Sequence, residues 1–330
     1  MRGQPLTRYE REKIEIFLRG KWKIRQIAKN LFRNHSVIVR ELARNTDKDG
    51  IYRAASAQIK AEKRLKRPYR KKLDTDEDLR NYVIQKLMLG WSPQIISGRL
   101  KNRPDSKITG SYVCHETIYQ YIYEGEGRFM GLYQYLVRKN KKRVRKFSRK
   151  PRKNKGLLHT TLIKYRPKEI NERQEFAHWE SDSIVSKKSK PGLSVQTERL
   201  TRLVRITKID NMSAEETEEA IKLQIETISP IYFKSITFDN GTEGANHWKL
   251  SMEYNIDTYH CDPYCSWQKG TVENTNGLIR RYLPKGTDFE TISRQQIYDI
   301  QERLNNRPRK VLEYKTPSEA WTEFTGQVVH

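Results

Sequence analysis

Three carboxylates stand at places in the sequence where an acid could do chemistry. Asp182 lies inside a strand-like segment, HWESDSIV, and Asp239 ends another strand-like segment in TFDNGTE. Glu273 falls on the first turns of a helix that the spacing predicts over 269–283. An acid within a strand is costly to bury unless it is paired or binds a cation. Three hard oxygen ligands from two strands and a helix suit Mg²⁺ or Mn²⁺ better than zinc.

Phosphoryl transfer is the chemistry that such a site favours. Two metal ions about 3.5–4 Å apart can activate the attacking oxygen and stabilise the leaving one. No residue has to become a covalent nucleophile, and the chain has no evident Ser/His/Asp or Cys/His triad. Taken singly, each acid has an ordinary structural explanation: a strand-end turn, a paired strand acid or a helix N-terminal acid. Their order on strand, strand and helix beside a basic half favours catalysis.

The charge of the chain is concentrated in its first half. The 330 residues carry a net +25, with 65 Lys and Arg against 40 Asp and Glu, and the pI is about 9.9. Residues 1–155 carry +26 and residues 156–330 carry −1. Nucleic acid is the first polyanion to expect, and an anionic membrane surface the second. No apolar run approaches the ~20 residues of a membrane span, and three cysteines do not make a disulfide framework. We therefore expect a soluble cytoplasmic protein.

The first 60 residues predict a helix-turn-helix DNA-binding domain. Thr7 and Glu10 have the spacing of a capping box at the start of a first helix. A second helix is expected near 24–31, and a third from Ser36 to Arg44. Ser36, Arg40 and Arg44 recur every four residues and would face outward together, as recognition-helix residues do. The alternative is a plain three-helix bundle without a ligand.

A second helix-turn-helix-like domain is expected over 70–137. Ser92 and Pro93 predict the start of one helix, and a short helix follows near 115–123. Residues 138–155 then hold twelve basic residues in eighteen and no acid, so 138–165 is interpreted as a basic linker. We expect DNA contacts there from Lys141, Arg143 and Arg145. A solvated charge run or a localisation signal is the alternative.

From about residue 175 the pattern predicts a mixed α/β core. Strands are expected near 179–185, 199–209, 235–239 and 256–260, and helices follow or alternate with them. Strands first, then strand and helix in alternation, predict a sheet with helices on its faces.

Longer motifs in this half resemble a known family. HWESD, FDNGTE, DPYCSWQKGTVENTNGLIRRYLPKGTDF and LNNRPRKVLEYKTPSEAW resemble the catalytic core of Asp-Asp-Glu insertion-sequence transposases, closest to the insertion sequence thirty family. The resemblance extends over nearly the whole chain, because the N-terminal modules resemble the family's terminal-repeat-binding region. The separations between the acids, 57 and 34 residues, also agree with that core.

The resemblance implies a multidomain protein, with an all-α helix-turn-helix region followed by an RNase H-like, integrase-type core over 170–330. Asp182, Asp239 and Glu273 would be the catalytic triad and would bind Mg²⁺ or Mn²⁺, with two ions expected. DNA or ligand-supporting contacts are expected from Lys269, Asn274, Asn276 and Arg280. Implied partners are the element's terminal inverted repeats, target DNA and at least one further copy of the chain, in the cytoplasm of a bacterium at its nucleoid.

Two alternatives to a transposase remain open at this point. One is a DNA-binding regulator that keeps an inactive nuclease-like domain, and the other is a nuclease without joining activity. His178 could orient a substrate or cap the sheet, and a structural role is favoured; Cys261 and Cys265 have no role that the sequence assigns. Buried structural cysteines are favoured over zinc ligands, because no second ligand pair stands at a suitable spacing.

Overall fold

The chain forms two compact units, Met1–Lys71 and Lys72–His330. The computed structural model describes residues 4–65, 72–105, 108, 110–136, 160–262 and 265–328. Lys141, Arg143 and Arg145, and most of the predicted basic linker, lie outside the described residues. In the described ranges no helix is long and apolar enough to cross a membrane.

The first unit is helical, as its pattern predicts. The capping box is formed: Thr7 Oγ1 accepts from the Glu10 N–H at 3.2 Å, and Glu10 Oε2 accepts from the Thr7 N–H at 2.7 Å. Apolar residues of successive helices, such as Ile14, Ile27 and Ile38, are fully buried against one another. Its helices are α1 (Arg8–Arg19), α2 (Ile24–Asn30), α3 (His35–Asn45) and α4 (Ala54–Leu65).

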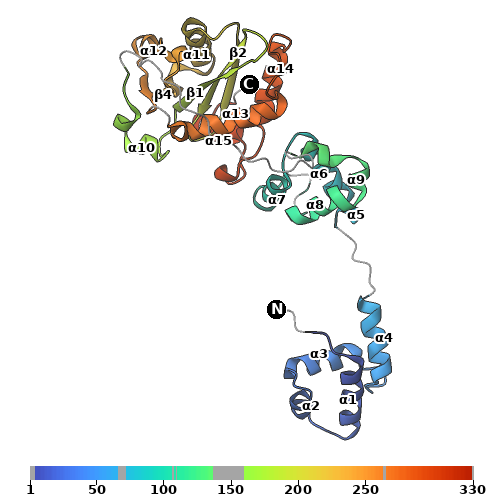
Figure 1. The fold of residues 1–330 in the computed structure, drawn as a ribbon. Coiled ribbons are helices and arrows are strands. Elements are labelled where there is room, and N and C mark those ends of the chain that lie inside the picture. The colour runs from blue at the N-terminus through green and yellow to red at the C-terminus, as the bar shows by residue number, and fades with distance from the viewer. Residues whose placement is uncertain are drawn as a thin grey trace. The chain divides into compact units, whose positions relative to one another are not determined.

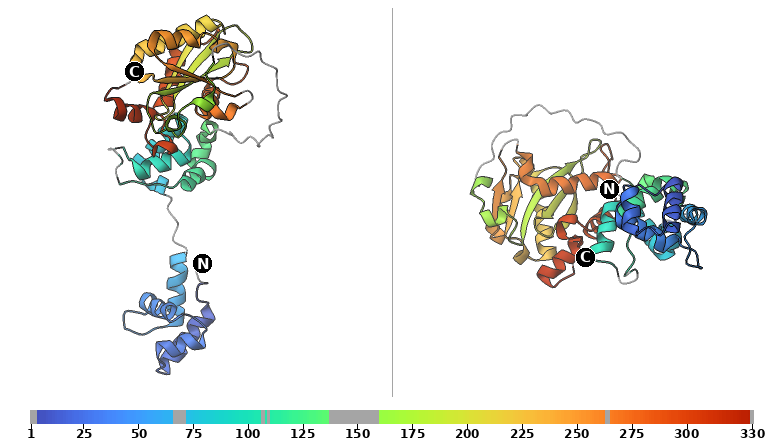
Figure 2. Two further views of the ribbon diagram at one scale, coloured as in Figure 1. Left: turned by 90° about the vertical axis from the view of Figure 1, so that its left-hand side faces the viewer. Right: turned by 90° about the horizontal axis from the view of Figure 1, so that it is seen from below.

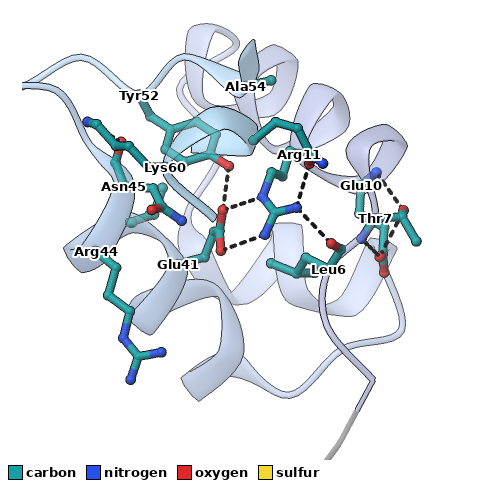
Figure 3. Close-up of polar contacts among 12 residues, drawn as sticks. Leu6, Thr7, Glu10, Arg11, Glu41, Arg44, Asn45, Tyr52, Ala54 and Lys60 are labelled. Atoms are coloured by element: carbon teal, nitrogen blue, oxygen red, sulfur yellow. Dashed lines mark hydrogen bonds and ion pairs between the residues drawn. The ribbon is translucent and has the colours of Figure 1, made fainter. Parts of the chain in front are cut away.

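A buried polar network fixes α3 against α1 (Figure 3). Arg11 Nε donates to Glu41 Oε1 at 2.8 Å, and its Nη1 donates to the Leu6 carbonyl at 2.7 Å. The Tyr52 hydroxyl donates to the same Glu41 oxygen at 3.0 Å. Arg44 points away from this network (Figure 3), so one face of α3 is fixed by buried charges while the opposite face stays exposed.

The second unit begins with a helical region. Ser92 is the N-cap of α7 as expected, and its hydroxyl accepts from the Ile95 N–H at 3.4 Å. Ile118, Tyr121 and Ile122 are buried in the core of this region, whereas Tyr123 is 42% exposed. Its helices are α5 (Lys72–Thr75), α6 (Glu77–Met88), α7 (Pro93–Asn102), α8 (His115–Glu124), α9 (Glu126–Phe129) and the 3-10 turn η2 (Leu132–Tyr135).

A five-stranded mixed sheet forms the centre of the second unit, in the order β3-β2-β1-β4-β5. The strands are β1 (His178–Val185), β2 (Gly192–Glu198), β3 (Val204–Ile209), β4 (Ser235–Phe238) and β5 (Asp257–His260). β1, β2 and β3 run antiparallel, and β4 and β5 run parallel to β1. Three antiparallel strands followed by two parallel ones in this order make up the RNase H-like arrangement, so the expected fold class is confirmed.

The strand expected over 199–209 is only half correct. β3 covers its second part, whereas its first part turns back from β2, with Arg202 at φ 64°. β2 itself was not predicted. Ser194, Gln196 and Thr197 interrupt its apolar residues, although every residue of the strand is buried.

Helices cover both faces of the sheet (Figures 1 and 2). On one face α13 and α14 bury residues such as Ile184, Val272 and Ile300, and on the other Trp179 and Trp321 share a second core with α11, α12 and α15. The helices and turns of this part are η3 (Ile163–Tyr165), α10 (Lys168–Asn171), α11 (Ala214–Ile228), η4 (Pro230–Tyr232), η5 (Thr242–Gly244), α12 (His247–Tyr254), η6 (Ser266–Lys269), α13 (Gly270–Tyr282), α14 (Arg294–Asn305), η7 (Lys310–Leu312) and α15 (Pro317–Thr325).

The helical region and the sheet region contact each other within the second unit. Both Nη atoms of Arg99 donate to the Glu319 carboxylate, at 2.7 and 2.6 Å, and Arg99 Nη1 also donates to the Tyr314 carbonyl at 2.9 Å. Gly98 lies so close to the Tyr314 ring that a Cβ there would come within 1.9 Å of it. A bidentate arginine pair and a glycine contact therefore connect α7 to the C-terminal segment.

Candidate active site and DNA-contacting helix

The register between two parallel strands brings Asp182 and Asp239 together. Glu180 of β1 lies opposite Thr237 of β4, and Asp182 and Asp239 each follow two residues later. The two aspartates follow the paired segment on adjacent strands, and paired strands lie about 4.8 Å apart. Asp239 directly follows the last residue of β4. Two of the three predicted acids therefore meet at one edge of the β1–β4 pair.

A lysine links the two aspartates. Lys269 Nζ lies 3.1 Å from Asp182 Oδ1 and 3.5 Å from Asp239 Oδ2, and it donates to the Ser181 carbonyl at 2.9 Å. Its side chain is 6% exposed, whereas those of Asp182 and Asp239 are 26% and 48% exposed. The two negative charges raise the pKa of Lys269 above its ordinary value and outweigh its burial. A buried ammonium therefore stands between two carboxylates.

Helix α13 supplies the remaining predicted residues. Asn276 Nδ2 donates to Asp182 Oδ2 at 2.6 Å. Lys269, the residue before the helix, donates to the other oxygen, so both oxygens of Asp182 accept a hydrogen bond. Glu273 is exposed, and its side chain makes no hydrogen bond or ion pair within the described parts of the chain; Asn274 is exposed beside it. Arg280 Nη2 donates to the Val185 carbonyl at 2.9 Å, and its guanidinium lies over the Phe289 ring.

Glu180 fixes the start of α13 on the sheet. Its carboxylate is fully buried and accepts from the N–H groups of Thr271 and Val272, at 2.9 and 3.0 Å, and from Arg199. Residues two apart on a strand face the same way, so Glu180 and Asp182 both point at α13. The sequence reasoning missed Glu180. Its signal was the spacing of the two acids in HWESD.

Glu180 offers a direct test of this positioning. Glu180→Gln leaves the Arg199 charge buried without its partner, so the free energy of unfolding should fall by ~3–5 kcal/mol. Thermal unfolding measures the change, with Glu290→Gln at an exposed position as the control. Equal melting temperatures for the two variants would contradict the structural role of the carboxylate.

A fourth carboxylate lies near the two aspartates and was also missed. Glu243, in the FDNGTE motif, has its pKa raised by burial, with the negative charges of Asp239 and Asp182 adding to the effect. Gly241, two residues before, donates its N–H to Asp239 Oδ1 at 3.1 Å. The turn after β4 therefore carries two acids toward one place.

The donor set fits a hard divalent cation. Asp182 and Asp239 offer carboxylate oxygens at one point, and the Lys269 ammonium already supplies positive charge there. No cluster of three close His, Cys, Asp or Glu ligands occurs in the described ranges, and Glu273 projects from α13 without joining the pair. Two carboxylates are thus close together, and the Glu273 side chain would have to rotate toward them to act as a third ligand.

His178, Cys261 and Cys265 can each be placed in the structure. His178 Nδ1 is 2.8 Å from Ser235 Oγ, a contact that connects β1 to the start of β4. Its Nε2 is 3.1 Å from Glu175 Oε2. Cys261 is buried, and burial raises the pKa of its thiol to about 11. Cys265 is a half-buried free thiol. His178 therefore joins two strands, and Cys261 packs as a neutral side chain.

In the first unit, the predicted recognition residues lie on one exposed face of α3. Ser36, Arg40 and Arg44 are all exposed. Arg40 Nε donates to the Ser36 carbonyl at 3.0 Å, and its Nη2 lies 3.1 Å from Ser36 Oγ. The side chain of Arg40 therefore lies along the helix, and its guanidinium keeps donors for a partner.

Comparisons with known proteins agree with this arrangement. Residues 2–45 match a family described as a helix-turn-helix domain. The chain is 34% identical to the transposase for insertion sequence element IS4351 of Bacteroides fragilis, over 98% of this chain and 97% of that one. It is 35% identical to transposase InsI for IS30A of Escherichia coli, over 95% of this chain and 82% of that one.

The likeness to solved structures is weaker. The catalytic core domain of BIV integrase matches 46% of this chain and 97% of that one, at 19% identity and a TM-score of 0.38. The assignment rests on the sequence relatives, which extend over almost the entire length. The chain therefore belongs to the IS30 family of insertion-sequence transposases.

Proposed function

We propose that this transposase binds the terminal inverted repeats of its element and cuts and joins DNA at the Asp182–Asp239 pair. The observation that carries the proposal is the strand register that brings these acids together beside the helix bearing Glu273. Phosphodiester hydrolysis would free a 3′-hydroxyl, and attack of that hydroxyl on a second phosphodiester would join the strands. Membership in the family supports this sequence of steps.

Asp182, Asp239 and Glu273 would hold the metal. Mg²⁺ or Mn²⁺, with two ions expected, would polarise the scissile phosphate and lower the pKa of the attacking water. Asn276 and Lys269 would hold the Asp182 carboxylate in place, since each donates to a different oxygen of it. Asn274 and Arg280 would lie on the DNA side of α13, where Asn274 is exposed.

Lys269 is better placed to position the carboxylates of the metal site than to contact DNA. Its ammonium is buried and already engaged by two carboxylates and a carbonyl. A phosphate would have to compete with those groups to reach it. We therefore assign Lys269 to the metal site.

The face of α3 is proposed to read the element's ends. Arg40→Ala should weaken binding to end DNA by about 1–3 kcal/mol while changing binding to random DNA little, because base contacts specify and phosphate contacts do not. Arg19→Ala, at an exposed arginine of α1, is the matched control. By contrast, replacing Lys141, Arg143 and Arg145 together should weaken binding to end DNA and to random DNA alike. An equal loss on end DNA and random DNA after Arg40→Ala would refute the recognition-helix assignment.

Incubation with labelled ends, target DNA and Mg²⁺ separates the proposed function from its two rivals. A transposase gives joined products that disappear when a chelator is added. A nuclease gives cut ends without joining, and a regulator leaves bound ends uncut. Because two ends must be brought together, at least a dimer is expected, and light scattering of the end complex measures it.

A further inference from the structure

Five arginines gather around α13, and the side-chain hydrogen bonds that four of them make all go to neutral acceptors. Among the described residues none of them forms an ion pair within 4.0 Å, unlike Arg99 and Arg199, which pair with Glu319 and Glu180. The five come from the loop before β1, the β2–β3 turn, the last turn of α13 and the segment after α14. They are Arg173, Arg202, Arg281, Arg307 and Arg309.

Their hydrogen bonds mark the two ends of the row. Arg173 Nη2 and Arg202 Nη1 both donate to Thr271 Oγ1, at 3.0 and 2.9 Å, so two guanidinium groups meet at the start of α13. Arg281, near the end of the same helix, donates to the Gly90 carbonyl at 3.2 Å. Ten residues of helix rise about 15 Å, which is the length over which the row extends.

Arg307 and Arg309 follow α14, and Arg309 Nη2 donates to the Leu304 carbonyl at 3.3 Å. Burial and the neighbouring Arg281 lower the pKa of Arg307 to about 10, and burial with Arg307 and Arg202 does the same for Arg309. Arg307 is only 6% exposed, and its side chain makes no hydrogen bond to any described residue. A buried guanidinium stays charged, so leaving it unpaired costs folding free energy.

Other arginines of the second unit reach either an acid or a neutral side chain: buried Arg166, for example, donates to Asn171 and Thr237. Arg99 is held by Glu319, and Arg199 by Glu180. Within the described ranges, the acceptors of the row are one hydroxyl and two carbonyls. A buried Nε–H without an acceptor occurs in Arg99 and Arg199 as well as in four members of the row, but Arg307 makes no side-chain hydrogen bond at all to a described residue. An unpaired group of this kind in a native fold points to a missing ion or ligand.

We infer that these five arginines form a binding site for consecutive backbone phosphates of one DNA strand. Guanidinium groups match phosphate oxygens in geometry and keep their charge. At ~3.4 Å of axial rise per nucleotide, the row corresponds to about four nucleotides. The inference rests on the proposed function and adds to it a place where DNA is held alongside the catalytic helix.

The test uses the full chain in EDTA, with fluorescence anisotropy on a 30-base-pair duplex of random sequence. Arg307→Gln combined with Arg309→Gln should reduce the slope of log affinity against log salt by about 2, and weaken binding at low salt about 10-fold or more. Arg294→Gln with Arg303→Gln removes the same charge from exposed positions of α14 and should leave the slope unchanged. Without DNA, the first double variant should melt at the same or a higher temperature, because it removes unpaired buried charge.

Two further variants keep the inference falsifiable. Arg307→Lys with Arg309→Lys retains the charge and should restore most of the salt slope. If the glutamine pair does not fold, Arg202→Gln at the half-buried end of the row should still reduce the slope by about 1. A slope equal to that of the α14 control would overturn the inference, as would a loss of affinity that only tracks a lower melting temperature. Because no metal is present, either failure would leave the assignment of Asp182 and Asp239 untouched.

Discussion

Replacing Asp182 by asparagine is expected to reduce strand cleavage and joining by at least about 10³-fold, or ~4 kcal/mol of transition-state stabilisation. The amide keeps the size of the side chain but removes one of the two charges that meet at the β1–β4 edge. Binding of end DNA in EDTA should stay within about twofold of the unchanged chain, since the predicted recognition residues lie in the other unit. Gel assays on labelled ends with Mg²⁺ or Mn²⁺ measure the products.

Asp299→Asn is the matched control for this variant. Asp299 is exposed on α14, where it accepts a hydrogen bond from Gln295. The control should cut and join as the unchanged chain does. If Asp182→Asn still joined DNA in Mg²⁺, the assignment of the acids would be wrong, whereas a loss of end binding in EDTA would point to misfolding.

Lys269→Met should destabilise the metal-free chain and tighten its affinity for a divalent cation. Removing the ammonium leaves Asp182 and Asp239 facing each other without positive charge, which should cost about 1–3 kcal/mol. The melting temperature in EDTA should fall by ~2–10 °C. A first Mn²⁺ no longer competes with a lysine, so its dissociation constant should fall several-fold.

Calorimetric titration with Mn²⁺ and thermal unfolding with and without 10 mM Mg²⁺ check this result. Added Mg²⁺ should raise the melting temperature more in the variant than in the unchanged chain. Lys249→Met removes a surface pair with Glu218 and should change neither quantity by much. A weaker Mn²⁺ affinity in Lys269→Met would show instead that the lysine orients the carboxylates for the metal.

Residues of the candidate site could be predicted from sequence where a charged side chain stood in or at the end of an otherwise apolar strand. Asp182 within a strand and Asp239 at a strand end were such residues, and both were identified. Their closeness was not visible in sequence, because it depends on parallel pairing between β1 and β4, whose residues lie more than fifty positions apart.

Other features escaped because their patterns are weak. β2 is an interior strand in which buried polar residues bond to each other: Gln196 Nε2 donates to Ser194 Oγ at 2.8 Å. Strand prediction reads alternating apolar residues, so a buried polar strand gives no signal. Glu180 escaped for a different reason: the spacing of the acids in HWESD was visible, but its partners Thr271 and Arg199 are distant in sequence.

The contact of Gly98 with the Tyr314 ring bears on how relatives of this chain can exchange parts. Replacing Gly98 by alanine would place a methyl group against the Tyr314 ring, and the adjacent Arg99 forms an ion pair with Glu319 of the C-terminal helix. The surface that receives α7 is thus built by the last tenth of the chain. A chimaera that took its helical region from one relative and its C-terminus from another would combine two halves of this junction that do not match. The two halves should therefore come from the same parent. We expect recombination between such genes to succeed at residues 66–71, and to fail at a crossover between Arg99 and Tyr314.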